Sequence, residues 1–338
     1  MPETYLVTGA TGNIGRSVVT TLLSLGQKVH VFTRNTSSKI AQELSSDGAT
    51  LFQGDFSNPS ALSSAARGCS GIFLLTIPGP DAATFASTAL EAFKSAALPD
   101  SVVVLTTSIF NDEKTSKLVN SPNAGLPNKP PHPFVTGYWS MNDAVETTVK
   151  ESGIPHWTIL RPAYFMSNYK DFNIRYIHFP ALSTEKKLVA AVKPETKFEM
   201  NDPHDIGVFA AHALAEKGQP RWEHKGISLA SEILTLEEKA AVLSRVSGIN
   251  IQAEFADEAE STKSAENDFV GYMWFWQRTL SAKVDMDEMR SFGLPLGSFE
   301  KYLTKHREEL IRALNDTKGG YGDMSTDELL AAAGQHGA

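Results

Sequence analysis

The feature that most constrains the fold of this chain is a glycine-rich turn within residues 5–15, Tyr-Leu-Val-Thr-Gly-Ala-Thr-Gly-Asn-Ile-Gly. A short apolar strand runs directly into Gly9, Gly12 and Gly15, and a helical pattern follows. Gly9 permits the tight turn, Gly12 lets backbone approach a pyrophosphate, and Gly15 lets the helix pack on the strand. The start of that helix presents free N–H groups to phosphates. The turn therefore predicts a dinucleotide-binding βα unit rather than a plain structural turn.

The first half of the chain alternates between strand-like and helix-like segments. This alternation predicts an α/β fold, a Rossmann doubly wound parallel sheet with helices on both faces. The expected strands are residues 4–8, 28–33, 49–53, 71–76 and 101–107, and the expected helices are 13–26, 36–46, 57–67 and 83–97.

Later segments suggest how the chain is divided. We expect an NADP(H)-binding core at 1–162, a smaller mixed α/β substrate-binding region at 163–316 interleaved with it, and a loosely attached tail at 317–338. Residues 111–137 are rich in proline and read as a long loop, either a lid or a surface insertion. Expected beyond this loop are strands at 157–160, 188–192 and 227–230 and helices at 138–152, 204–216, 235–247 and 299–316.

The residue after the second strand bears on the form of the cofactor. NAD enzymes usually place an acidic residue here, whereas Arg34 suits the 2′-phosphate of NADP(H). No acidic residue lies between Gly26 and Lys39, and Arg16 at the start of the first helix is placed to assist. The alternative is that Arg34 is a solvated loop cation. NADP(H) is the expected cofactor.

Asp55 and Phe56, which follow the third strand, are expected to lie at the adenine end of the cofactor site. Asp55 is expected to accept a hydrogen bond from the adenine amino group, to cap the helix at 57–66, or to do both, and Phe56 follows it. The expected cofactor-binding residues in this half are Gly9, Thr11, Gly12, Asn13, Ile14, Gly15, Arg34, Asp55, Phe56 and Thr76.

Composition excludes several classes of function. The net charge is −8 without a basic cluster, so no nucleic-acid partner is expected. Cys69 is the single cysteine and reads as a small buried residue. No apolar run has membrane-spanning length, and no leader is visible, so we expect a cytoplasmic protein without membrane contact. No metal-ligand spacing and no Gly-x-Ser-x-Gly motif is present.

Two further segments, together with the glycine turn and Arg34, resemble the NmrA-like family, an atypical branch of the short-chain dehydrogenases. They are Ser-Gly-Ile-Pro-His-Trp-Thr-Ile-Leu-Arg-Pro-Ala-Tyr-Phe-Met-Ser-Asn at 152–168 and Asn-Asp-Pro-His-Asp-Ile-Gly at 201–207. The resemblance covers roughly residues 4–310. It implies a nicotinamide near Tyr164 and Phe165, and a choice among reductases, NADP(H)-sensing regulators and tailoring enzymes of secondary metabolism.

Short-chain dehydrogenases carry a Tyr-x-x-x-Lys pair, in which the lysine binds the nicotinamide ribose and its charge lowers the pKa of the tyrosine. This chain departs from that pattern, because the corresponding segment reads Tyr138-Trp-Ser-Met-Asn142. The two residues share one helix face. Asn142 keeps a hydrogen bond to the nicotinamide ribose but lacks the charge, so the pKa of Tyr138 is expected to stay at about 10. Tyr138 then donates a proton but is a poor base. Alternatively, Tyr138 packs on the proline-rich loop. The third polar position is Ser108 or Thr107, and either is otherwise a strand-end cap.

Weaker candidates surround this group. His132 in the proline-rich loop either reaches a substrate or is a surface histidine, and His204 in the second family segment is a candidate acid near the start of a helix. A set of aromatic residues and one methionine after the expected core either walls an apolar pocket, which suits an aromatic or terpenoid-sized substrate, or packs in the core. The set comprises Tyr164, Phe165, Met166, Tyr272, Trp274, Phe275 and Trp276.

These residues predict an NADPH-dependent reductase of a small, largely apolar carbonyl or enone. The replacement by Asn142 keeps two alternatives open. One is a sensor that binds NADP(H), turns nothing over and docks to a protein partner. The other is a non-redox isomerase or cyclase that uses the Rossmann pocket.

Overall fold

The computed structural model describes residues 1–76, 79–109, 133–170, 179, 181–257, 259 and 284–316. The expected loop residues 111–132, His132 among them, lie outside this description, as does the tail at 317–338. The same holds for the four expected pocket residues Tyr272, Trp274, Phe275 and Trp276.

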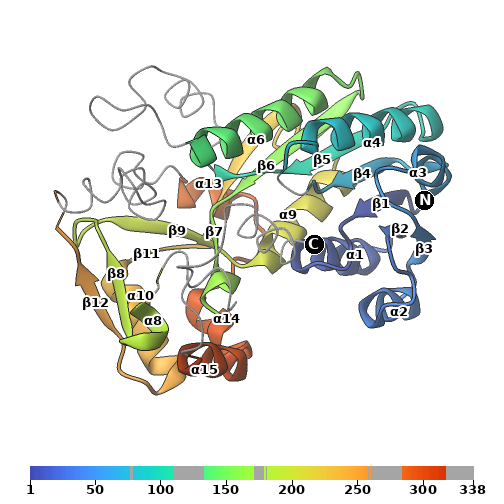
Figure 1. Cartoon of the computed structure of the whole chain (residues 1–338). Helices are drawn as coiled ribbons and strands as arrows, with labels where there is room; N and C mark the ends of the chain where they lie inside the picture. Colours follow the sequence, from blue (N-terminus) through green and yellow to red (C-terminus); the bar gives the residue numbers. More distant parts are fainter. Residues whose placement is uncertain are drawn as a thin grey trace.

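A seven-stranded sheet forms the centre of the molecule (Figure 1), and its paired strands are all parallel. Its strands are near-continuous apolar runs, as strands covered on both faces require; β5, for example, reads Val-Val-Val-Leu-Thr and is buried throughout. The strand order is β10-β6-β5-β4-β1-β2-β3. The strands are β1 (Thr4–Thr8), β2 (Lys28–Thr33), β3 (Thr50–Gln53), β4 (Gly71–Leu74), β5 (Val102–Thr106), β6 (His156–Pro162) and β10 (Lys225–Leu229).

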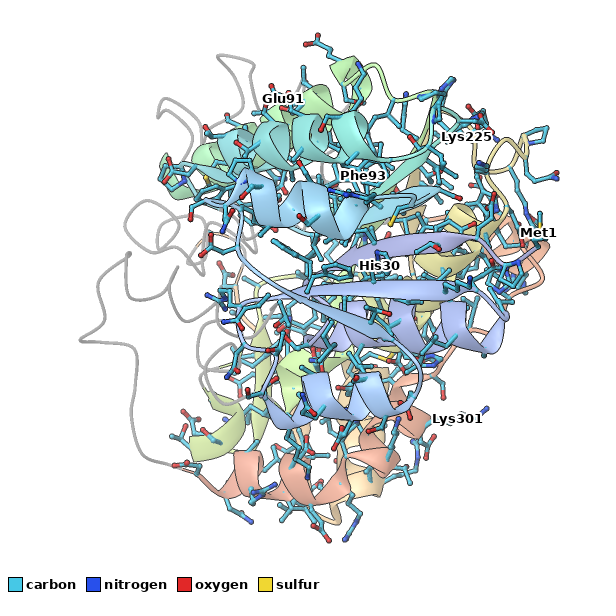
Figure 2. The ribbon with its side chains drawn as sticks, turned by 90° about the vertical axis from the view of Figure 1, so that its right-hand side faces the viewer. Met1, His30, Glu91, Phe93, Lys225 and Lys301 are labelled. Atoms are coloured by element: carbon cyan, nitrogen blue, oxygen red, sulfur yellow. The ribbon has the colours of Figure 1, made fainter. Side chains whose placement is uncertain are left out.

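Helices cover both faces of this sheet, which confirms the doubly wound α/β fold. Figure 2, seen from the β3 edge, shows the sheet between the two helical layers. One layer holds α1 (Asn13–Ser24), α2 (Lys39–Ser46) and α9 (Pro203–Ala215), and the other holds α3 (Pro59–Ala66), α4 (Ala82–Ala96) and α6 (Pro133–Glu151).

A smaller mixed region packs around a second apolar core. Its three-stranded sheet has the order β11-β9-β7, and β8 pairs with β12. Its elements are β7 (Tyr164–Phe165), β8 (Lys187–Ala190), β9 (Lys197–Asn201), β11 (Glu232–Thr235), β12 (Gln252–Phe255), the 3₁₀ turn Met166–Tyr169, α8 (Ala181–Thr184), α10 (Leu236–Ser247), α14 (Phe299–Lys305) and α15 (Arg307–Asn315). The helix α13 (Met286–Ser291) instead packs on the core of the large sheet, where Phe292 contacts Phe209 of α9. Between β9 and β11 the chain returns to the large sheet to form α9 and β10, so the two regions are interleaved in sequence.

Several expected boundaries were wrong. Helix α6 begins at Pro133, inside the expected loop 111–137, because proline is well tolerated in the first turn of a helix. The expected helix 299–316 is two helices that meet at His306, where no glycine or proline signals the break. The strands β9 and β11 were missed because each carries only two apolar residues.

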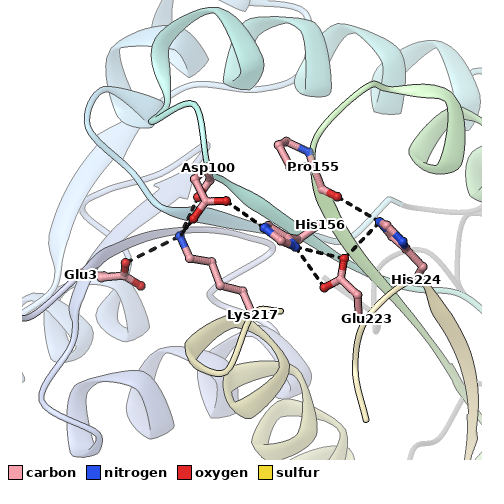
Figure 3. Close-up of polar contacts among 7 residues, drawn as sticks. All are labelled: Glu3, Asp100, Pro155, His156, Lys217, Glu223 and His224. Carbon is pink, nitrogen blue, oxygen red and sulfur yellow. Dashed lines mark hydrogen bonds and ion pairs between the residues drawn. The ribbon is translucent and has the colours of Figure 1, made fainter. Parts of the chain in front are cut away.

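A charged cluster joins the amino-terminal ends of several strands of the large sheet (Figure 3), opposite the edge of the glycine turn. The ring of His156 lies between two carboxylates, with Nε2 at 2.8 Å from Asp100 and Nδ1 at 3.0 Å from Glu223. Lys217 from the turn after α9 pairs with Asp100 at 3.2 Å and with Glu3 at 3.7 Å. Burial opposes protonation of the ring, but the hydrogen bonds to Asp100 and Glu223 outweigh it and raise the pKa of His156.

This cluster makes stability depend on pH. Because the folded pKa of His156 is raised, its contribution is fully present below the unfolded value of about 6.5 and is lost as pH rises through the folded value. His156→Gln is therefore expected to lower the free energy of unfolding by about 1 kcal/mol at pH 5.5 and by less at pH 9. Denaturant titrations at the two pH values measure the difference. Asp100→Asn should reduce the same pH dependence, and an equal loss from His156→Gln at both pH values would contradict the assignment.

Candidate functional site

The glycine turn has the geometry that a bound pyrophosphate requires. Gly9 leaves β1 with φ of +61°, a left-handed conformation that favours glycine, and its carbonyl accepts from the Gly12 N–H at 3.1 Å. Helix α1 starts after Gly12. A Cβ added to Gly15 would lie 2.1 Å from the Gly9 carbonyl oxygen, so any side chain there would push the helix off the turn. The first turn of α1 holds no acidic residue, so its N–H groups can receive an anion.

Of the other residues in and next to the glycine turn, some are buried in the core and others are exposed to solvent. Ile14 is buried in the core beneath the sheet, so only its backbone can serve a cofactor. Asn13 is exposed and Thr11 is half-buried. Arg16, which was expected to assist Arg34, instead pairs with Glu43 of α2 at 3.0 Å.

The adenine end of the expected site lies beyond the carboxyl ends of β2 and β3. Arg34 is exposed, and its charge is one of the influences that lower the pKa of Asp55, after two larger ones from Ser57. The expectation that Asp55 caps the next helix was wrong, because Asn58 caps α3 by accepting from the Ala61 N–H at 3.1 Å. Asp55 instead accepts from the Ser57 N–H at 2.9 Å.

Two more expected contacts lie along the same edge of the sheet. The half-buried ring of Phe56 stacks on Phe85 of α4 with centroids 6.1 Å apart. Thr76 lies two residues beyond the end of β4 and is half-buried. Because the carboxyl ends of parallel strands share one edge, these side chains and the glycine turn face the same crevice region of a doubly wound sheet.

The three residues predicted to be catalytic come together. Tyr138 and Asn142 lie one turn apart on α6, and the Asn142 amide donates to the Tyr138 carbonyl at 2.9 Å. Ser108 follows the end of β5 and interacts with the Tyr138 hydroxyl. Burial raises the pKa of Tyr138, while the hydrogen-bonding influence of Asn142 and Ser108 lowers it less strongly. The expected unperturbed pKa was therefore wrong, because burial of the phenol disfavours its charged form.

The choice between Ser108 and Thr107 is also informed by the structure. Ser108 is the one that approaches Tyr138, whereas the Thr107 hydroxyl donates to Glu146 at 2.9 Å. His204 does not join the group in the described part of the chain. Its ring pairs with Asp205 at 3.7 Å in the first turn of α9, and Asp202 caps this helix.

Sequence reasoning missed a buried ion pair next to this group. Glu146 is fully buried on α6, one turn after Asn142, and Arg161 of β6 binds both of its oxygens, at 2.9 and 2.7 Å. Burial favours the neutral carboxyl, but the hydrogen bonds and charge of Arg161 outweigh it and lower the pKa of Glu146. The available signal was Arg161 at the end of the strand, directly after the apolar pair Ile159 and Leu160.

The two expected nicotinamide neighbours form β7, directly after β6. Phe165 packs against the core of the large sheet, and Tyr164 meets Tyr169 edge-on at 5.8 Å. Asn201 of β9 fixes this connection by accepting from the Ala163 N–H at 2.6 Å. The two rings thus lie where the large sheet passes into the smaller region.

Cys69 is fully buried, as expected. Burial raises the pKa of its thiol to about 12. Among the described residues, no group of three or more histidine, cysteine or acidic side chains is arranged to hold a metal ion. Within the same described residues, no helix is both long and apolar enough to span a membrane.

Comparison with known families and structures agrees with this geometry. The sequence profile described as NAD(P)H-binding matches residues 9–192, more than half of the chain. The chain belongs to the NAD(P)H-binding family. The profile of the NmrA-like family matches residues 116–274, which confirms the resemblance expected from residues 152–168 and 201–207.

Individual relatives include enzymes and a regulator. A (4-alkanoyl-5-oxo-2,5-dihydrofuran-3-yl)methyl phosphate reductase of Streptomyces griseus is 29% identical over 249 residues, which cover 72% of this chain and 73% of the reductase. An NADPH-dependent quinone oxidoreductase of Escherichia coli complexed with NADPH has a TM-score of 0.65 at 22% identity, covering 89% and 99% of the two chains. The negative transcriptional regulator NmrA in complex with NADP also has a TM-score of 0.65, at 18% identity, covering 94% and 98%.

Proposed function

We propose that this chain is an NADPH-dependent reductase of a small, largely apolar carbonyl or enone compound. The observation that carries the proposal is the meeting of Tyr138, Ser108 and Asn142 at the carboxyl edge of the sheet that also bears the glycine turn. The phenol of Tyr138, the hydroxyl of Ser108 and the amide of Asn142 together suit a reaction in which a substrate oxygen gains a proton.

Each side chain has a distinct task in this proposal. The bound cofactor supplies a hydride to the carbon of the polarised double bond. Tyr138 donates its phenolic proton to the substrate oxygen, and Ser108 orients that oxygen. Asn142 donates one amide hydrogen to the Tyr138 carbonyl and also interacts with the Tyr138 hydroxyl, so its amide oxygen remains for a ribose hydroxyl. The products are the reduced substrate and NADP⁺, and Tyr138 regains its proton from solvent.

The raised pKa of Tyr138 supports a role as acid rather than base. The structure describes no cation among the influences on its hydroxyl, and burial, which favours the neutral phenol, outweighs the hydrogen bonds of Asn142 and Ser108. Reduction needs the protonated form, whereas alcohol oxidation would need the phenolate. We therefore infer that the chain works in the direction of reduction.

The substrate class follows from the site's surroundings and its relatives. The rings of Tyr164 and Phe165 stand beside the expected nicotinamide position, and such rings suit an apolar or aromatic substrate. The related phosphate-ester reductase and the quinone oxidoreductase are both named for the reduction of unsaturated oxygenated compounds.

The test is NADPH consumption, followed by absorbance, across a panel of enones, aromatic aldehydes, quinones and azo compounds. We expect oxidation of NADPH that depends on at least one apolar acceptor and yields its reduced product one for one. Tight binding of NADPH without consumption across the panel would contradict the proposal. A product formed without NADPH oxidation would instead indicate a non-redox isomerase or cyclase.

Arg34 is expected to select NADPH over NADH. Arg34→Ala should weaken NADPH binding roughly 10- to 100-fold, because charge-assisted hydrogen bonds to the 2′-phosphate are lost, and leave NADH binding within about twofold. Calorimetric titration of both cofactors measures this. Lys39→Ala is the matched control, since Lys39 is an exposed cation on the adjoining helix. An equal loss of NADH and NADPH binding would show that Arg34 does not contact the 2′-phosphate.

A second candidate function is an NADP(H) sensor without turnover. It is favoured by Asn142, which supplies no charge to the site, and by the likeness in fold to a transcriptional regulator. This candidate predicts a strong preference for either NADP⁺ or NADPH in the same titrations, and a protein partner whose affinity differs between the two loaded forms. Comparable binding of NADP⁺ and NADPH together with turnover would exclude it.

A further inference from the structure

We propose that the buried Glu146–Arg161 ion pair is a positioning network that holds Tyr138 and Ser108 together for proton transfer. This inference rests on the proposed reductase function and adds two residues to it. Neither charged group is among the side chains that interact with the Tyr138 hydroxyl, so both would act through their neighbours.

The first link runs through helix α6. Tyr138, Asn142 and Glu146 are spaced four residues apart, so they share one face of the helix. Arg161 binds Glu146 through two hydrogen bonds, and this fork geometry fixes orientation as well as distance. The rotation of α6 about its axis, and with it the direction of the Tyr138 side chain, is thereby tied to β6.

The second link runs through the end of β5. The oxygen of Glu146 that accepts from Arg161 Nε also accepts from the Thr107 hydroxyl, at 2.9 Å. The Thr107 N–H in turn donates to the Leu160 carbonyl of β6 at 2.9 Å. Since Ser108 is the next residue, one carboxylate sets the helix that carries the acid against the strand end that carries its hydroxyl partner.

The third link comes from β10 on the other side. A Cβ added to Gly226 would lie 2.5 Å from Arg161 Nη1, so the guanidinium fills the space that glycine leaves open. Lys150 also contacts Glu146, at 3.2 Å, but its side chain is 39% exposed. Lys150 is therefore the cation that can be removed without disturbing the buried fork.

Stability alone does not account for such an arrangement. A buried ion pair and an apolar pair of similar volume are often equally stabilising, because desolvation offsets the attraction of the charges. What an apolar pair cannot reproduce is the fixed geometry. A displacement of about 1 Å at a reacting group can lower a rate roughly 100-fold.

The test is the double variant Glu146→Leu/Arg161→Met, which removes both charges together. We expect it to fold with an unfolding midpoint near that of the wild type, to bind NADPH with unchanged Kd, and to lose at least tenfold in kcat. Lys150→Met should keep kcat within about twofold. Gly226→Ala, which presses on the guanidinium from β10, should lower kcat in the same direction and serves as the deciding variant if the double variant does not fold.

A readout without turnover separates this inference from the proposed function. With 3-fluorotyrosine at position 138, the ¹⁹F resonance reports the environment of the phenol directly. We expect one narrow line in the wild type and in Lys150→Met, and a shifted or broadened line in the double variant and in Gly226→Ala. If the wild type consumes no NADPH, the reductase proposal fails, while the resonance still shows whether the network positions Tyr138. Wild-type kcat and a wild-type resonance in a folded double variant would overturn the inference.

Discussion

Replacing Tyr138 with phenylalanine is expected to lower kcat for NADPH-dependent reduction by roughly 10²- to 10⁴-fold, the usual contribution of a positioned acid. The reason is that the phenolic hydroxyl, which interacts with Ser108 and Asn142, is the proposed proton donor. Removing one oxygen leaves the packing of α6 in place, so the Kd of NADPH should change by no more than about twofold. Steady-state kinetics and calorimetry on the same preparation measure the two effects.

The pH profile provides the control for this variant. Because burial raises the pKa of Tyr138, the acid stays protonated through neutral pH, and wild-type kcat should decline only as pH rises beyond the ordinary tyrosine value of about 10. The Tyr138→Phe variant should lack this decline. Retention of wild-type kcat by the variant would mean that a water molecule or another group returns the proton.

Replacing Lys239 with methionine is expected to raise the free energy of unfolding by roughly 1–4 kcal/mol at pH 7, as when other buried charged groups give way to apolar ones. Lys239 of α10 is 1% exposed, and its ammonium nitrogen lies 3.6 Å from the ring centroid of Phe198. In the described part of the chain, that nitrogen makes no hydrogen bond or ion pair. Burial therefore lowers the pKa of Lys239 well below its usual range, although the charge of Glu199 opposes this.

The sign of the pH dependence follows from that lowered pKa. Between the folded and unfolded values the unfolded chain binds the extra proton, so wild-type stability rises with pH up to about 10.4. The advantage of Lys239→Met should consequently be larger at pH 7 than at pH 9.5. Denaturant unfolding at both pH values tests this, with Lys301→Met, at an exposed position of α14, as a control that changes stability by less than about 0.5 kcal/mol. Destabilisation by Lys239→Met would show that the amine has a partner that the structure does not reveal.

The fold was predictable where the chain repeats one physical pattern. Buried parallel strands are runs of apolar residues, and the glycine turn has local steric requirements, so β1, β2 and the turn could be placed from sequence. The smaller region was predicted less well. Strands such as β9 become strands through pairing with distant segments, and a five-residue stretch with Phe198 and Met200 as its apolar positions carries a weak signal.

In the candidate site, too, the features set by local sequence were predictable and those set by contacts between distant segments were not. The spacing of Tyr138 and Asn142 placed both on one helix face, and the position of Ser108 after a strand placed it at the same edge of the sheet. The spacing of residues in the sequence could not predict how deeply these side chains are buried. The raised pKa of Tyr138 depends on how much protein covers it, and the Glu146–Arg161 pair depends on the distance between a helix and a strand. The cap of α3 at Asn58 in place of Asp55 is a local example, since both residue types and positions suit capping.

The most direct test of the account is hydride transfer from NADPH that carries deuterium at C4 of the nicotinamide, with benzalacetone and the rest of the enone and aldehyde panel as acceptors. Mass spectrometry of the products and absorbance of the cofactor are followed together. The account predicts that a panel member gains one deuterium on carbon for each NADPH oxidised, and that Tyr138→Phe suppresses both signals equally. Tight NADPH binding with no deuterium in any product would contradict it.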